Sequence, residues 1–425
     1  MITKLKNFLD NCPSAYHAVA QLKNRLEGEG YRFLPQEESW ELMPGGKYYT
    51  IKGDSMIAAF RIPEQITGGF MIAAAHCDFP GFRVKGELKG KYNRLDVERY
   101  GGAILSSWLD RPLSVAGRVL VQTEEGVESR LVDIDRDLLL IPNVAIHMDR
   151  KQNEGKNWNP AVDLLPLAGL EGAKESLQSL LEAQAGGEIL GQDLFLYVRD
   201  KARIWGEDDA FISAQGLDDL QSVLGCTEGF LGAKTGNSVP VLCIFDSEEV
   251  GSCSPQGAAS TVLSRLLGRI CAARGLDPDS MLAKSLLLSA DNAHGIHPNH
   301  PEYADPKNAP VLGGGVVLKY NANLRYTTDG LTGALVKKLC QKANVPVQEY
   351  WNRADLVGGS TLGCVSLGQV SIPSADIGLA QLAMHSAWET ASVQDTAYMA
   401  ELMATFFATA LELPRQGCYC LRTAK

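Results

Sequence analysis

Three nearly unbroken apolar runs constrain the fold of this chain most, because each has the length and composition of a strand buried on both faces. The runs occupy residues 70–75, 239–245 and 285–288. Between the last two lies a stretch at 258–273 whose apolar residues recur at helical spacing. Strand, helix and strand in that order predict a right-handed crossover in an α/β sheet.

The rest of the chain predicts a second, β-rich module. With 425 residues, the chain exceeds what one hydrophobic core usually serves. Ser14 is placed to cap a helix over 15–26, whereas short alternating stretches such as 117–121 and 193–198 are typical of half-buried strands. We therefore expect a discontinuous α/β domain formed by 1–88 and 212–425, with a β-rich domain inserted at 89–211.

Charge and composition narrow the function classes. Forty Lys and Arg against fifty Asp and Glu give a net charge of −10, which argues against a nucleic-acid partner. No apolar run approaches the roughly 20 residues of a membrane span, and the N-terminus lacks the apolar region of a signal peptide. The ten cysteines are scattered without framework spacing. We expect reduced thiols and a cytoplasmic, membrane-free protein.

Each predicted strand is followed by residues that carry chemistry. His76 and Asp78 follow the first run, Glu248 and Glu249 follow the second, and Asp291 follows the third. In open α/β sheets, ligands bind beyond the carboxyl ends of the strands. We therefore expect these side chains to meet at one edge of the sheet.

The pattern indicates a metal cluster, to which the pair Asp218 and Asp219 adds further oxygen donors. A single histidine or acidic pair is usually an ordinary loop or helix-start residue, but several buried like charges need a cation. Histidine with carboxylates and no thiolate favours Zn²⁺, with Mn²⁺ or Co²⁺ as possible replacements. Neighbours such as Glu248 and Glu249 point apart on extended chain, so one can bind metal while the other acts as a base.

Longer motifs resemble the M18 family of metallo-aminopeptidases, the aspartyl aminopeptidases. Matching segments run in family order over nearly the whole chain, at residues 13–19, 76–81, 141–147, 246–252, 289–299 and 358–361. The resemblance implies a zinc-exopeptidase-like α/β/α catalytic domain with an inserted β-rich dimerisation domain. It also implies peptide substrates with a free N-terminus and a tetrahedral dodecamer built from dimers.

The resemblance implies two Zn²⁺ per subunit and assigns their ligands. Asp218 resembles the aspartate that bridges both ions. His76 and Asp291 would complete the shell of one ion, while Glu249 and His385 would complete the other.

The resemblance also assigns catalytic and substrate-binding roles. Glu248 matches the general base that deprotonates the attacking water, and Asp78 matches the residue that orients the metal-binding histidine. Lys319 resembles the basic residue that meets an acidic substrate side chain. His297 is expected to contact substrate, and His147 is expected to reach the active site of a neighbouring subunit.

Alternatives remain open at the level of sequence. Cys77 and Phe79 occupy positions where relatives often carry small hydroxyl residues, and a thiol at position 77 could alter metal preference. Some family members prefer neutral N-terminal residues. A neutral-preferring aminopeptidase and an N-acyl amino acid deacylase fit the same two-metal site, and a self-assembling shell protein with a vestigial metal site is a rival of another class.

Overall fold

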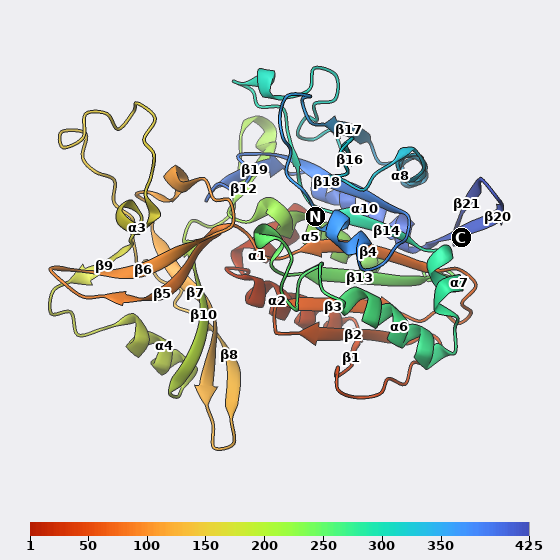
Figure 1. Cartoon of the computed structure of the whole chain (residues 1–425), viewed down its shortest axis with the longest axis horizontal. Coiled ribbons are helices and arrows are strands. Elements are labelled where there is room, and N and C mark those ends of the chain that lie inside the picture. The colour runs from red at the N-terminus through yellow and green to blue at the C-terminus, as the bar shows by residue number, and fades with distance from the viewer. Residues whose placement is uncertain (425) are drawn as a thin grey trace.

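The computed structural model describes residues 1–424, which form an α/β body and a smaller β-rich body beside it (Figure 1). The α/β body is built on a mixed sheet of 13 strands. These strands are β1 (Arg32–Phe33), β2 (Lys47–Lys52), β3 (Met56–Arg61), β4 (Phe70–His76), β11 (Arg203–Trp205), β12 (Phe211–Ala214), β13 (Val239–Phe245), β14 (Leu286–Ala290), β15 (Ala293–His294), β16 (Val316–Tyr320), β17 (Val347–Trp351), β18 (Ser374–Leu382) and β19 (Glu389–Ser392). No helix among residues 1–424 is long and apolar enough to cross a membrane.

The centre of this sheet consists of four parallel strands in the order β13, β4, β14 and β18. The runs at 70–75, 239–245 and 285–288 form β4, β13 and β14, so their prediction as buried strands is confirmed. Because the strands are parallel, their carboxyl ends meet at one edge of the sheet.

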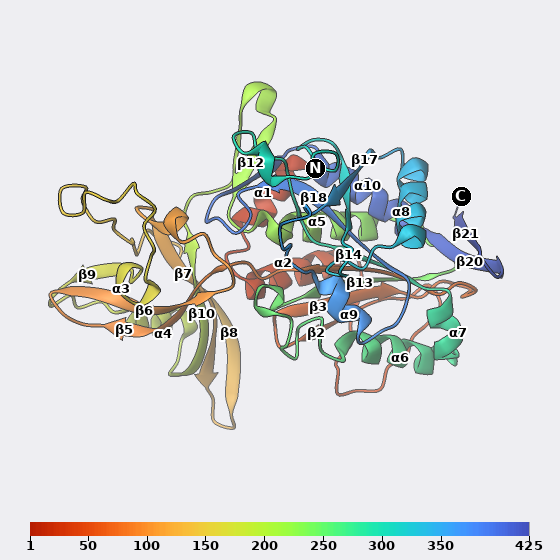
Figure 2. The ribbon, with the colours of Figure 1, turned by 45° about the horizontal axis from the view of Figure 1, so that its top comes forward.

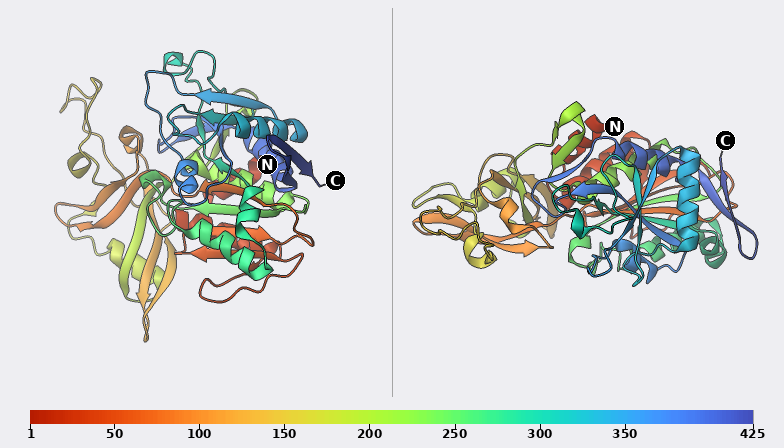
Figure 3. Two further views of the ribbon diagram at one scale, coloured as in Figure 1. Left: turned by 45° about the vertical axis from the view of Figure 1, so that its right-hand side comes forward. Right: turned by 90° about the horizontal axis from the view of Figure 1, so that it is seen from above.

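Helices cover both faces of the sheet, which confirms the predicted α/β/α architecture (Figures 2 and 3). Along β4, Met71 and Ala73 belong to one core while Phe70 and Ile72 belong to the other, as the two-residue period of a strand requires. The first core is closed by α1 (Ile2–Asp10), α2 (Ala15–Gly28), α5 (Leu217–Gly232), α8 (Gly330–Ala343) and α10 (Asp395–Phe407). The second core is closed by α6 (Val262–Arg274), α7 (Pro278–Ala283) and α9 (Leu362–Leu367).

The β-rich body has a six-stranded sheet in the order β8-β7-β10-β5-β6-β9. Its strands are β5 (Gly81–Leu88), β6 (Tyr92–Tyr100), β7 (Leu113–Gln122), β8 (Val127–Asp133), β9 (Leu167–Leu170) and β10 (Ile189–Val198). Trp108, in the short helix η1 (Leu105–Trp108), is fully buried in its core, which α4 (Leu177–Ala185) helps to close; α3 (Pro160–Asp163) lies in the loop before β9. A separate hairpin of β20 (Thr409–Arg415) and β21 (Cys418–Thr423) ends the described chain.

The borders of this sheet differ from the expected insert at 89–211. The sheet starts earlier, because β5 pairs with β6 as an antiparallel hairpin and buries Phe82 and Val84 in the second body. It also ends earlier, because β11 pairs with β12 in the main sheet. The strands of the second sheet therefore span residues 81 to 198.

Candidate active site

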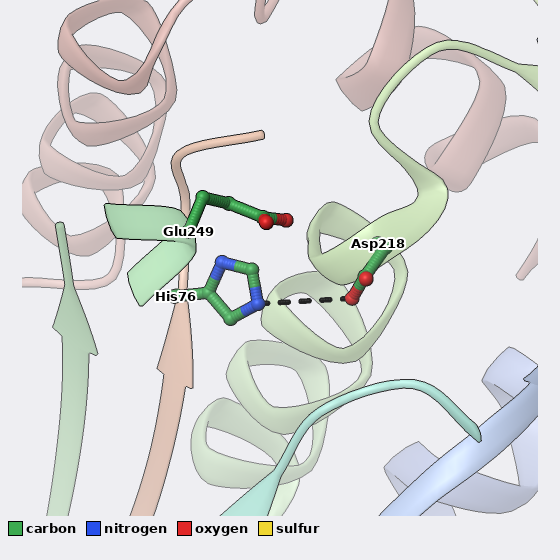
Figure 4. A group of neighbouring side chains, drawn as sticks. All are labelled: His76, Asp218 and Glu249. Atoms are coloured by element: carbon green, nitrogen blue, oxygen red, sulfur yellow. Dashed lines mark ion pairs between the residues drawn. The ribbon is translucent and has the colours of Figure 1, made fainter. Parts of the chain in front are cut away.

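Polar side chains gather at the carboxyl ends of the central strands, as Figure 4 shows for His76, Asp218 and Glu249. His76 ends β4, Glu249 lies in the short helix η3 (Glu248–Val250) after β13, and Asp218 lies in the first turn of α5. The potential ligand atoms of these three residues all lie within 4.8 Å of one another. A second group with the same property contains Asp218, Asp219 and Asp291.

Asp218 is the centre of the site, because its two carboxylate oxygens face different histidines. Oδ1 lies 3.7 Å from Nε2 of His76, and Oδ2 lies 3.6 Å from Nε2 of His385. The same nitrogen of His385 lies 3.4 Å from Oε2 of Glu249. Ligands bound tetrahedrally to Zn²⁺ at about 2.0–2.1 Å lie roughly 3.4 Å apart. The observed separations therefore fit a cation on each side of Asp218.

Unsatisfied buried oxygens give independent support for bound cations. Among residues 1–424, Oδ1 of Asp218, Oδ1 of Asp219 and Oε1 of Glu249 are buried and have no hydrogen-bond partner. A buried carboxylate oxygen without a donor is costly, and a cation removes that cost. The donor set of imidazole nitrogen and carboxylate oxygen suits zinc.

The site is also where the pKa values of the acids are most disturbed. Burial, reinforced by nearby carboxylates, raises the pKa of Glu248 to about 8, although His76 opposes the shift. Burial likewise raises the pKa of Asp291 to about 6. For Asp218, burial acts in the same direction, but hydrogen bonds with His385 and His76 outweigh it and lower the pKa. Such clustering of perturbed acids is typical of functional sites.

Asp78 holds the turn that follows β13. Its carboxylate accepts hydrogen bonds from the backbone N–H groups of Glu248 at 3.0 Å and Glu249 at 3.2 Å. Nδ1 of His76 lies 3.0 Å from the backbone oxygen of Asp78 and 3.5 Å from its carboxylate. Asp78 and His76 are therefore in contact, and the backbone carbonyl of Asp78 lies closer to the imidazole than its carboxylate does.

Glu389 is a site residue that the sequence analysis did not single out. It is fully buried, and it accepts the backbone N–H of Asp218 at 3.0 Å and that of His385 at 2.7 Å. Burial, together with the charge of Asp218, raises its pKa to about 8. Glu389 thus holds the backbone of two predicted ligands, Asp218 and His385. No local motif marks it, because Glu389 is a single acid at the start of the short strand β19.

The three predicted substrate contacts lie in different surroundings. Lys319 is 2% exposed, and its ammonium group donates to the backbone oxygens of Asp291 at 2.7 Å and Asn292 at 3.1 Å. His297 is exposed, and its nearest partners, such as the N–H of Asn299 at 3.2 Å, belong to its own loop. His147 is exposed in the loop between β8 and α3, which stands away from the α/β body (Figure 1). Within one chain, the fold brings Lys319 to the cluster and leaves His147 apart from it.

Comparison with known proteins matches this architecture. Residues 8–407 match the family model "Aminopeptidase I zinc metalloprotease (M18)". The "Probable M18 family aminopeptidase 2" of Clostridium novyi (strain NT) is 41% identical over 422 residues, covering 95% of this chain and 98% of the relative.

Two solved structures share the fold over most of the chain. The chain in "Cryo-EM structure of the Ape4 and Nbr1 complex" is 34% identical, with a TM-score of 0.91 and coverage of 96% of this chain and 85% of that one. The chain in "Structure of S. cerevesiae mApe1 dodecamer" is 25% identical, with a TM-score of 0.84 and 96% of each chain covered. With the family model spanning almost its entire length, this chain belongs to the M18 family of zinc metallo-aminopeptidases.

Proposed function

We propose that the protein removes one N-terminal residue from peptides at a site of two zinc ions per subunit, with a preference for N-terminal Asp or Glu. The observation that carries the proposal is the arrangement of Asp218, whose two oxygens face His76 and His385. A carboxylate that offers one oxygen to each of two ions is the arrangement of two-metal hydrolases. Asp291 would complete the ligand shell of the ion beside His76, and Glu249 would complete the ligand shell of the ion beside His385. Co²⁺ and Mn²⁺ are possible replacements for zinc.

In this proposal the chain itself supplies the proton transfers. Zinc bound at the site supplies a Lewis acid that polarises the scissile carbonyl and lowers the pKa of water. Glu248 accepts the proton of the attacking water at its carboxylate and returns it to the leaving amine nitrogen. Two features support this role: Glu248 lies next to the ligand Glu249 on a turn held by Asp78, and its carboxylate makes no hydrogen bond within residues 1–424.

The preference for acidic residues rests on the positive charge of Lys319. Two of its ammonium protons are donated to backbone oxygens, and the ammonium lies 3.6 Å from Oδ1 of Asp291. A lysine ammonium has three protons, and the third makes no hydrogen bond of normal length to Asp291, so we propose that a substrate carboxylate accepts it. A desolvated carboxylate needs such a partner, which is why an acidic side chain is the expected occupant.

The proposed assembly is a tetrahedral dodecamer of dimers, with the β-rich body as the dimerisation domain. The S. cerevesiae relative named above is a dodecamer by its own description, which supports this expectation. In the proposed assembly, the exposed His147 reaches the active site of a neighbouring subunit, and His297 contacts substrate. A cytoplasmic location is proposed because all ten cysteines are free thiols.

A substrate panel tests the proposal against its alternatives. Metal-stripped protein is re-supplied with Zn²⁺, Mn²⁺ or Co²⁺ and assayed on Asp, Glu, Leu and Lys anilides, each with a free or an acetylated α-amine. We expect cleavage of the free Asp and Glu substrates only. Cleavage of free Leu substrates instead would indicate a neutral-preferring aminopeptidase. Release of acetate from the acetylated substrates, with the anilide bond intact, would indicate a deacylase. No cleavage with any metal would favour the shell protein with a vestigial site.

A further inference from the structure

A tyrosine of the β-rich body contacts Asp78 of the candidate active site. Tyr100 is the last residue of β6, and its hydroxyl donates a hydrogen bond of 2.7 Å to Oδ2 of Asp78. Its ring packs edge-on against Phe195 of β10, with 5.3 Å between the ring centroids. The second sheet therefore fixes where this hydroxyl lies.

Asp78 links Tyr100 to the turn after β13 through hydrogen bonds. The carboxylate that Tyr100 contacts also accepts the N–H of Glu248 and the N–H of Glu249, at 3.0 and 3.2 Å. Asp78 is 4% exposed, so solvent offers little replacement for a lost donor. In a buried carboxylate with few donors, each hydrogen bond constrains the orientation of the group.

The residues after Tyr100 lie against the same site. A Cβ atom on Gly101 would come within 3.1 Å of Cβ of Glu249, and one on Gly102 would come within 3.2 Å of Nδ1 of His385. The N–H of Ile104 donates to the backbone oxygen of His385 at 2.9 Å. The segment 100–104 thus fits closely against two predicted ligands, and a side chain on either glycine would displace them.

We propose that Tyr100 is a positioning residue: its hydroxyl, anchored in the second sheet, fixes through Asp78 the turn that carries Glu248 and Glu249. The inference rests on the proposed roles of those two acids. It makes the β-rich body a structural part of the active site, in addition to its proposed role in assembly.

The test compares Tyr100→Phe with a matched control, Tyr197→Phe. Tyr197 lies in the same sheet, and its hydroxyl donates to Oδ1 of Asp133 at 2.6 Å, away from the metal cluster. Loss of one hydrogen bond to a charged group corresponds to roughly a ten- to a hundredfold change, so we expect kcat to fall by that factor in Tyr100→Phe. KM should stay within about threefold, because the substrate does not touch Tyr100, and Tyr197→Phe should keep the kcat of the unmodified protein.

A double-mutant cycle shows whether Tyr100 acts through Asp78. In an Asp78→Ala background, Tyr100→Phe should lower kcat by less than about twofold, because the contact that it removes is already gone. Equal losses in both backgrounds, or a kcat for Tyr100→Phe equal to that of Tyr197→Phe, would overturn the inference.

Zinc affinity separates a failure of this inference from a failure of the proposed function. Because the turn also carries Glu249, Tyr100→Phe should weaken zinc binding by about tenfold relative to Tyr197→Phe, whether or not peptides are cleaved. If the unmodified protein cleaves no peptide, the proposed function fails, and this affinity difference still decides the role of Tyr100. Unchanged affinity would count against that role.

Discussion

Removal of the metal should reverse the usual dependence of stability on pH. In the metal-free site, burial raises the pKa of Asp291 from 3.8 to about 6 and that of Glu248 from 4.5 to about 8. A carboxyl whose folded-state pKa lies above its unfolded value holds its proton better when folded, so stability is lost as the pH rises through the folded value. His76 acts in the same direction: burial alone would lower its pKa, but hydrogen bonds with Asp218 and Asp78 raise it.

The expected magnitude follows from one carboxyl. For Glu248, whose pKa rises from 4.5 to about 8, most of the shift falls between pH 5.5 and 8.5 and corresponds to about 3 kcal/mol of unfolding free energy. The shift of Asp291 is mostly complete below pH 5.5 and adds less. At the entropy of unfolding expected for a chain of 425 residues, about 3 kcal/mol corresponds to about 3 °C in melting temperature, and the other raised groups add to it. The chelated protein should therefore melt at least about 3 °C lower at pH 8.5 than at pH 5.5.

The assay is thermal melting of chelated and zinc-loaded protein at half-unit steps from pH 5.5 to 8.5. The difference between the two curves is the relevant quantity, because Asp395 titrates in both forms. Burial raises the pKa of Asp395 to about 6, although hydrogen bonds from the N–H groups of Gly313 and Gly315 oppose the shift. Asp395 lies at the start of α10 in the α/β body. The reasoning is refuted if the chelated protein keeps or gains stability, relative to the zinc-loaded form, as the pH rises.

Three substitutions test single residues of the site. Glu248→Gln should lower kcat by about 10²- to 10⁴-fold while zinc content, measured by mass spectrometry, stays unchanged; activity within tenfold of the unmodified protein contradicts its role as the base. Glu389→Gln should weaken zinc binding by about 10- to 100-fold in a chelator competition, because the amide replaces one of the two acceptors for Asp218 and His385; an unchanged affinity contradicts this. Lys319→Met should reduce the preference for Asp over Leu substrates by about tenfold or more, whereas an equal loss on both substrates together with weaker zinc binding would show that Lys319 only supports Asp291.

The parts of the fold that could be predicted are those encoded locally. The apolar runs of β4, β13 and β14 are short and unbroken, so both the strands and the residues that follow them could be located from sequence. The parallel order of these strands then places His76 and Asp291 at the same edge. Their convergence follows from the α/β architecture and needs no further information.

The remaining site residues come from parts of the chain that give no local signal. His385 follows β18, whose carboxyl end lies at the same edge as that of β14, but Gly378 and Gln381 interrupt the apolar pattern of this strand. Glu389 opens β19, and the antiparallel pairing of β19 with β18 brings it back to Asp218. His385 could be assigned only through the resemblance to the M18 family, and Glu389 was missed. The resemblance assigns only Asp218 of the acidic pair as a ligand, yet the carboxylate of Asp219 belongs to the second group of potential ligands.

The borders of the second sheet show the same limitation. The alternation of β5 fits a strand of either sheet, and its pairing with β6 is decided by the hairpin that joins them. The role of Tyr100 was equally hidden, because the contact with Asp78 joins two separate bodies of the chain. Contacts of this kind depend on how the two bodies pack against each other, and the spacing of apolar residues along the sequence does not reveal that packing.

The central claim is that Asp218 lies between two ions, and zinc stoichiometry tests it most directly. Metal-stripped protein is titrated with Zn²⁺ while bound zinc and peptidase activity are followed together, for the unmodified chain and for Asp218→Asn and His385→Ala. The account predicts two ions per chain at full activity, tight binding of one ion in His385→Ala, and loss of tight binding at both positions in Asp218→Asn. A single ion per chain at full activity, or two tightly bound ions in Asp218→Asn, would contradict it.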